Sequence, residues 1–164
     1  MMAKPEFLRR MQLNWRPAIS SGIVAGVVAT GAQIFLWLVF TDALPEIFYR
    51  DARLTAAILL GQGVLPPPAT FNWKVMIIAT VIHFAISIAY SLILSRLLSH
   101  INTMLYLFAG SIYGLIVYAI NMYGVTAIFP WFSEARDWIT VVTHIVFGIS
   151  LAGTYKVLSR TYSP

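Results

Sequence analysis

The chain has 164 residues, of which 59% are hydrophobic and only 10% are charged, and its formal net charge is +5. Ordinary soluble domains carry about 25% charged residues, so a water-soluble protein of this length is excluded and the bilayer is the solvent. The basic residues stand at the ends of apolar segments rather than in a stripe, which argues against nucleic acid as a partner. The chain has no cysteine, and this excludes disulfides, thiolate metal sites and cysteine nucleophiles.

Four apolar segments are long enough to cross the hydrocarbon core of a bilayer, which is about 30 Å thick. They predict an all-α membrane protein, a four-transmembrane-helix bundle that forms a single integral membrane domain over residues 1–164. We expect the spans at about residues 17–41, 74–97, 102–125 and 137–157.

Residues 42–73 form the longest connection and contain an apolar stretch, so a fifth span has to be considered. Gly61 and the three prolines at 66–68 break any long helix there, and we reject the fifth span. Pro45 and Glu46 suit a helix start, and we expect a short interfacial helix on the outer membrane surface, with a re-entrant loop as the alternative. One face of this helix should carry Ile47, Leu54, Ile58 and Gly61, and another should carry Arg50, Arg53 and Ala57.

The distribution of lysine and arginine predicts the orientation of the chain. Four spans place both termini on one side of the membrane, and that side carries seven basic residues against four on the other. Five of the six acidic residues lie on the opposite side. Because cytoplasmic loops are enriched in Lys and Arg, both termini are expected to be cytoplasmic.

The four spans resemble two tandem two-helix units. Three residues of the first span recur 88 positions later in the third, since Gly22, Gly26 and Gln33 correspond to Gly110, Gly114 and Asn121. A histidine follows in the next span of each unit, at His83 and His144. Both units enter the membrane from the same side, which predicts a parallel repeat with a pseudo-two-fold axis along the membrane normal.

Small residues are expected at the helix seams, because close approach of helices in lipid depends on van der Waals packing. Helical periodicity places five glycines on inward stripes, and we predict that these pack the helices: Gly22, Gly26, Gly110, Gly114 and Gly148.

The sharpest candidate for function is a polar cluster inside the membrane. Counting residues from the outer span ends places two histidines and two amides at similar depth, roughly 10–14 Å below the outer boundary. The predicted cluster comprises His83, His144, Gln33, Asn121, Thr80 and Thr143. We place no Asp, Glu, Lys or Arg at this depth, which argues against an ion-coupled pump.

Three interpretations of the cluster remain open. Neutral histidines can hydrogen-bond to the amides and threonines and hold helices together. Alternatively, His83 and His144 can ligate a b-type haem or a metal ion between spans two and four, although no third ligand supports a catalytic zinc. In the third interpretation, the cluster forms a pathway for a small solute or a proton. No hydrolase signature accompanies the histidines, and we expect no enzymatic activity and no catalytic residue.

The chain resembles the YagU-like family of bacterial inner-membrane proteins. The resemblance rests on Gly22-Ile-Val-Ala-Gly26-Val-Val, on Thr80-Val-Ile-His83 and on the span around His144. It implies four spans and a location in the bacterial inner (plasma) membrane, and it carries no activity. We therefore expect a non-enzymatic accessory or structural membrane component, whose partners are the lipid bilayer and either other membrane subunits or a second copy of itself.

Overall fold

The computed structural model describes residues 15–98 and 105–161, which are helical and contain no strand. Its long helices are α2 (Trp15–Phe40), α4 (Trp73–Leu98), α5 (Tyr106–Ala119) and α6 (Trp138–Thr161). Four segments are long and apolar enough to cross a membrane, the third being α5 with the turns that continue it to Ala127. The predicted all-α four-helix architecture is thus confirmed. The fourth helix runs to Thr161 rather than to 157, and the start predicted for the third span, residue 102, lies outside the described residues.

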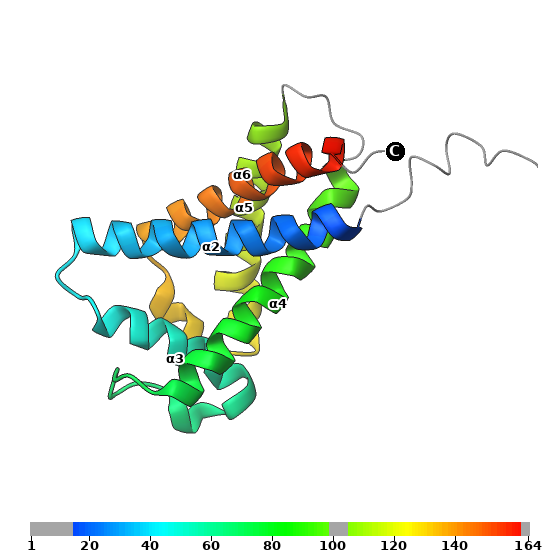
Figure 1. Ribbon diagram of the computed structural model, residues 1–164. Helices are drawn as coiled ribbons and strands as arrows, with labels where there is room; N and C mark the ends of the chain where they lie inside the picture. The colour runs from blue at the N-terminus through cyan, green and yellow to red at the C-terminus, as the bar shows by residue number, and fades with distance from the viewer. Residues whose placement is uncertain (1–14, 99–104, 162–164) are drawn as a thin grey trace, which may run out of the picture.

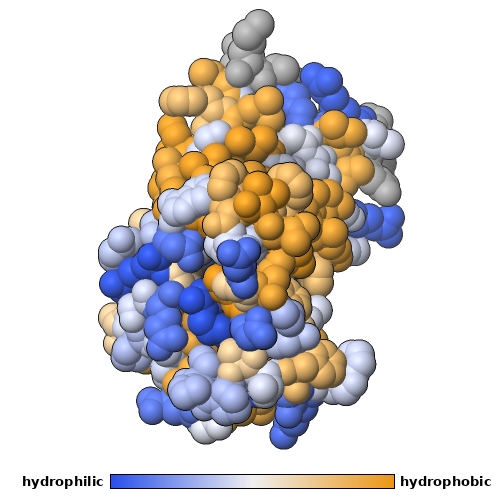
Figure 2. Space-filling view, turned by 90° about the vertical axis from the view of Figure 1, so that its left-hand side faces the viewer, coloured by the Kyte–Doolittle hydropathy of each residue, from blue (hydrophilic) through white to orange (hydrophobic). Residues whose placement is uncertain are grey.

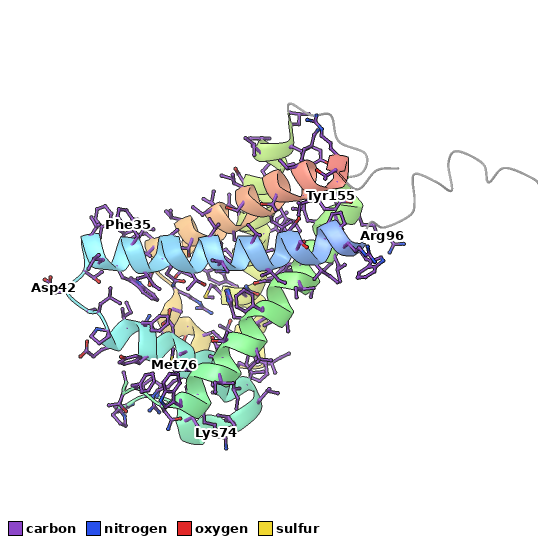
Figure 3. The ribbon with its side chains drawn as sticks, viewed as in Figure 1. Phe35, Asp42, Lys74, Met76, Arg96 and Tyr155 are labelled. Atoms are coloured by element: carbon purple, nitrogen blue, oxygen red, sulfur yellow. The ribbon has the colours of Figure 1, made fainter. Side chains whose placement is uncertain are left out.

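Helix α2 occupies the centre of the arrangement. It packs against α4 on one side and against α6 on the other, and α5 packs mainly against α6. α4 and α5 make few contacts with each other. α2 and α4 cross near the N-terminal end of α2, beside Arg96, and diverge toward Asp42 and Lys74 (Figures 1 and 3). α2 and α4 are therefore close together at the end that holds the start of α2 and farther apart at the other end.

The helix α3 (Glu46–Leu60) lies in the opening between α2 and α4 (Figure 1). It follows Pro45 as expected and ends at Gly61, whose N–H donates 3.0 Å to the Ala57 carbonyl and whose φ of 77° turns the chain out of the helix. Leu54 and Ala57 are both buried, each at 1% exposure, although they are expected on different faces of a helix that lies on the membrane surface. A methyl side chain is small enough to let α3 approach its neighbours closely, and this burial turns α3 into a wall of the interior.

The connection from α5 to α6 is a series of short turns. α5 continues into a π-helical turn, η3 (Ile120–Gly124), then η4 (Val125–Ala127) and η5 (Pro130–Ala135). Arg136 fixes this connection, because its Nε donates 2.7 Å to the Met122 carbonyl and its guanidinium lies 4.5 Å from the centre of the Tyr123 ring. A π-turn widens the helix locally and changes the direction in which its side chains project.

The surface of the described helices is strongly apolar. Many large hydrophobic side chains on α2, α4 and α5 are more than 40% exposed, including Val27, Leu38, Ile93 and Phe108. Hydrophilic residues gather in the lower half of the molecule, where α3 and the turns before α6 lie, whereas the upper half is mostly hydrophobic (Figure 2). An apolar surface of this extent fits a lipid environment and marks α3 as part of the polar end.

Candidate functional site

Two seams of close helix packing position both histidines. An added Cβ at Gly26 on α2 would meet three side chains of α4, the nearest being His83 Nε2 at 3.1 Å. An added Cβ at Gly114 on α5 would meet the backbone carbonyl of His144 on α6. The same relation holds one turn away, where Gly22 faces Ser87 and Gly110 faces Gly148. Each seam thus brings a histidine against the first helix of its own unit.

His144 belongs to a continuous chain of hydrogen bonds. Its Nδ1 donates 2.7 Å to the carbonyl of Thr140, and its Nε2 therefore accepts from Asn121 Nδ2 at 3.2 Å. The Asn121 carbonyl oxygen accepts from the Tyr90 hydroxyl at 2.6 Å, and the Tyr90 backbone carbonyl accepts from Tyr113 at 2.7 Å. The chain links α4, α5 and α6, and it occupies both ring nitrogens of His144.

His83 is held much more loosely. Its Nε2 lies 3.4 Å from the carbonyl of Gly26 and 3.3 Å from Thr30 Oγ1, and both distances are at the long end for hydrogen bonds. Because a carbonyl can only accept, Nε2 carries the proton and Nδ1 is the acceptor nitrogen. Among the described residues, no hydrogen bond to His83 Nδ1 is formed.

The two histidines share the walls of two neighbouring cavities. One cavity, of about 360 Å³, lies between α2, α3, α4 and α6 and includes Trp37, Asp51 and Thr140 in its wall. The other, of about 470 Å³, lies between α2, α4, α5 and α6. We call them the α3 cavity and the α5 cavity. Thr30, Gln33, His83 and His144 belong to the walls of both, so the cavities meet at the histidine layer.

Two polar groups in the wall of the α3 cavity have no protein partner. Trp37 is 2% exposed and Thr140 is 4% exposed, yet neither Trp37 Nε1 nor Thr140 Oγ1 forms a hydrogen bond within the described residues. Leaving a buried donor unsatisfied costs about 1–3 kcal/mol. Both groups line the same cavity, and this points to a hydrogen-bonding occupant.

Asp51 brings a carboxylate to the same cavity. Its Oδ2 accepts a long bond of 3.4 Å from Gln33, and its Oδ1 is 2.8 Å from both Nε and an Nη of Arg50. Burial raises the pKa of Asp51 above its ordinary value of 3.8, and Arg50 opposes this rise. The expectation that no acidic group lies near the histidines is therefore wrong. Helix α3 packs beside α4 and places Asp51 in the wall of the same cavity as His83 and His144.

The two predicted threonines lie apart from each other. Thr80 is exposed on α4 at the edge of the α3 cavity, and its hydroxyl donates 2.8 Å to the carbonyl of Met76 in its own helix. Thr143 is buried in the wall of the α5 cavity and donates 3.1 Å to the Thr140 carbonyl. Neither hydroxyl hydrogen-bonds to a histidine, so the predicted cluster consists of two parts rather than one network.

Ligation of a haem or metal ion by both histidines would require the bond from Asn121 to His144 to break. Iron ligation needs a free ring nitrogen on each histidine, and both nitrogens of His144 are engaged. Within residues 15–98 and 105–161, no group of three or more His, Cys, Asp or Glu side chains is placed to hold a metal ion. The geometry instead favours hydrogen bonding to an organic molecule.

The predicted polar cluster did not include four residues that shape the site: Trp37, Asp51, Tyr90 and Thr140. Trp37 resembled an interfacial anchor, and Asp51 lay in a loop expected at the surface. Tyr90 and Thr140 lie on the inward stripes of their helices, and that periodicity is the signal by which they could have been found.

Comparisons of the chain with protein-family models, with curated proteins and with solved structures found no match.

Proposed function

We propose that this protein is a small non-enzymatic membrane protein that binds a neutral, lipid-soluble molecule in the α3 cavity. The observation that carries the proposal is the pair of unpartnered groups in its wall, Trp37 Nε1 and Thr140 Oγ1. A bound molecule with oxygen acceptors would satisfy both groups. Most other wall residues are apolar, among them Ile34, Phe84 and Phe132, which is typical of sites for small organic ligands.

The charge of the wall disfavours an anionic ligand. Asp51 is the one acidic residue of the wall among the described residues, and Glu134 and Asp137 add negative potential close to it. No lysine or arginine of the described residues lines the cavity, and Arg50 is already paired with Asp51. An anion would therefore find no free cationic partner in the wall, whereas a neutral carbonyl compound would meet two donors.

The entrance faces lipid rather than water. Val27 and Ile34 on α2 and Thr80 on α4 line the cavity and are exposed on helices that can cross a membrane. A molecule dissolved in the bilayer can thus enter between α2 and α4 without crossing a polar surface. This is our reason for proposing binding from the membrane rather than transport of a water-soluble solute.

The remaining assignments rest on the sequence patterns described above. We propose a bacterial inner membrane with both termini cytoplasmic, on the excess of basic residues at that side. We also propose that the chain arose from two tandem units, and the matching neighbours of Gly26 and Gly114 support this. The resemblance to the YagU-like family stays a prediction.

A purely structural or accessory role is the second candidate. The continuous chain from Tyr113 through Tyr90 and Asn121 to His144 favours it, because these groups satisfy one another and leave nothing for a ligand. On this view the protein supports other membrane subunits, or assembles with itself, through its lipid-facing helices.

A pair of matched compounds separates the two candidates. Duroquinone and durene have the same methylated ring, but only duroquinone carries carbonyl oxygens. We expect duroquinone to raise the melting temperature of the purified protein in mild detergent and durene to leave it unchanged. Trp37→Phe or Thr140→Val should weaken duroquinone binding about tenfold, the factor that corresponds to ~1.4 kcal/mol for one lost hydrogen bond.

Matched substitutions control for the loss of side-chain volume. Trp73→Phe changes an exposed tryptophan outside the α3 cavity, and Thr143→Val removes a hydroxyl that is already bonded within its own helix. Both variants should bind duroquinone like the parent chain. Equal responses to duroquinone and durene, or unchanged binding in both test variants, would leave the structural role as the better account.

A further inference from the structure

The α5 cavity is the larger of the two, and the duroquinone site leaves it unused. Its wall is largely apolar and includes Ile86, Ile93, Val117 and Phe147. Two of its polar wall groups, Asn121 and Tyr90, already bond to each other at 2.6 Å. This cavity therefore offers volume and apolar contact but few free hydrogen-bonding groups, which is the opposite of the α3 cavity.

The two cavities adjoin at the histidine layer, and each has exposed residues of spanning helices in its wall. They share Thr30, Gln33 and His83 in their walls. The α5 cavity reaches the surface beside α4, where Ile86 is 39% and Ile93 is 54% exposed. Its mouth lies between α4 and α5, the two long helices that make few contacts with each other.

We propose that one ligand occupies both cavities: a neutral amphiphile with a carbonyl-bearing head in the α3 cavity and a single apolar tail in the α5 cavity. This inference rests on the proposed function, because it assumes that the α3 cavity binds the head. His83 lies in the walls of both cavities, and its Nε2–H, which makes only long contacts with Gly26 and Thr30, can donate to a carbonyl oxygen of the head. The tail leaves between α4 and α5 into the hydrocarbon core.

The charge of the head and the number of tails determine which membrane amphiphiles fit the two cavities. A free fatty acid has one tail but an anionic head, which Asp51 disfavours. A phospholipid has two tails and a charged head that exceeds the polar groups available. An isoprenoid or alkyl quinone has a neutral ring with carbonyl oxygens and one tail, and it matches both cavities. Binding alone is proposed, with no electron transfer.

The test measures how tail length affects affinity. Binding of duroquinone and of decylubiquinone is compared in the parent chain, in Ala89→Phe and in Ala85→Phe, by ligand-induced stabilisation in the same detergent. Ala89 is exposed and lines the α5 cavity, whereas Ala85 is also exposed on α4 and lines neither cavity. Because all proteins share one detergent, partition of the tailed compound into micelles is the same for each.

We expect Ala89→Phe to weaken decylubiquinone binding about tenfold relative to Ala85→Phe, and to leave duroquinone binding unchanged. Palmitate should bind neither variant nor the parent chain. If duroquinone binds and decylubiquinone binding is equal in both variants, the tail site is wrong and the head site stands. If palmitate binds as tightly as decylubiquinone, the neutral head is wrong. If duroquinone itself fails to bind, the proposed function fails with it.

Discussion

The two helix pairs share a packing plan but differ in how their histidines are satisfied. In the α5–α6 pair, His144 is bonded through both ring nitrogens and Tyr118 packs against its ring at 5.5 Å between centroids. In the α2–α4 pair, Thr30 takes the place that Tyr118 has by the 88-residue offset, and it forms only a long bond to His83.

This difference is one reason for placing the proposed ligand site beside His83. A tyrosine fills the space beside His144 and completes a structural network, whereas a threonine beside His83 leaves space open. Gln33, which corresponds to Asn121, bonds to Asp51 instead of to its histidine. Both histidines line the cavities, but only His144 is bonded through both ring nitrogens, whereas His83 makes only long contacts.

The largest effect should come from closing the α5–α6 seam. Gly114→Ala places a Cβ against the backbone carbonyl of His144, which cannot move without shifting a helix, so we expect a loss of about 3 kcal/mol in unfolding free energy. Gly26→Ala meets side-chain atoms at 3.1–3.2 Å and should cost about 1 kcal/mol. Unfolding by SDS titration measures both.

Gly31→Ala is the control for the glycine pair. Nothing lies within 4 Å of a Cβ at this helical position, so alanine should be neutral or should stabilise by about 0.5–1 kcal/mol through its helix propensity. Equal losses at Gly26 and Gly114 would contradict the difference between the two seams.

Replacing each histidine in turn should separate the effect on unfolding free energy from the effect on ligand affinity. His144→Ala leaves Asn121 Nδ2 without its acceptor and should cost about 2 kcal/mol. His83→Ala breaks only the long contacts and should cost less than about 1 kcal/mol, while changing ligand affinity more than His144→Ala does. SDS titration and duroquinone binding are measured on the same preparations. A larger stability loss at His83 would reverse the assignment of roles.

Removing a single hydroxyl group beside each histidine should change the unfolding free energy in the same order, by smaller amounts. Tyr90→Phe removes the 2.6 Å bond to Asn121 and should lower the unfolding free energy by about 1 kcal/mol. Thr30→Val removes only the 3.3 Å contact with His83 and should change it by a few tenths of a kcal/mol, near the lower end for bonds between membrane helices. Thermal unfolding in detergent can resolve the two, and the reverse order would argue against a continuous chain at His144.

The smallest expected effect concerns pH. Burial raises the pKa of Asp51 in the folded state above 3.8, so the folded protein holds this proton more tightly than the unfolded chain does. Stability from this group is therefore greatest at low pH and falls as pH rises from about 4 through the folded-state pKa. Melting temperatures across this range should show the fall in the parent chain and lack it in Asp51→Asn. A rise with pH that Asp51→Asn abolishes would mean that Arg50 dominates.

The sequence predicted the spans well because hydropathy and helix length report directly on lipid contact. The inward stripes could also be derived, since Gly26, Gly114 and both histidines follow helical periodicity. The sequence could not predict how α3 packs, because a helix at the polar end of a membrane protein can lie on the surface or fill a gap between spans. That choice depends on the divergence of α2 and α4, and it determines where Asp51 and Trp37 lie.

Exposed residues of spanning helices in the cavity walls decide which concentration matters for the ligand that we propose. A ligand that enters from the hydrocarbon core is sampled at its mole fraction among lipids, not at its molarity in water. Occupancy would then follow the lipid-to-ligand ratio, and diluting the aqueous phase at a fixed ratio would leave it unchanged. Such a protein would report on the composition of its own bilayer.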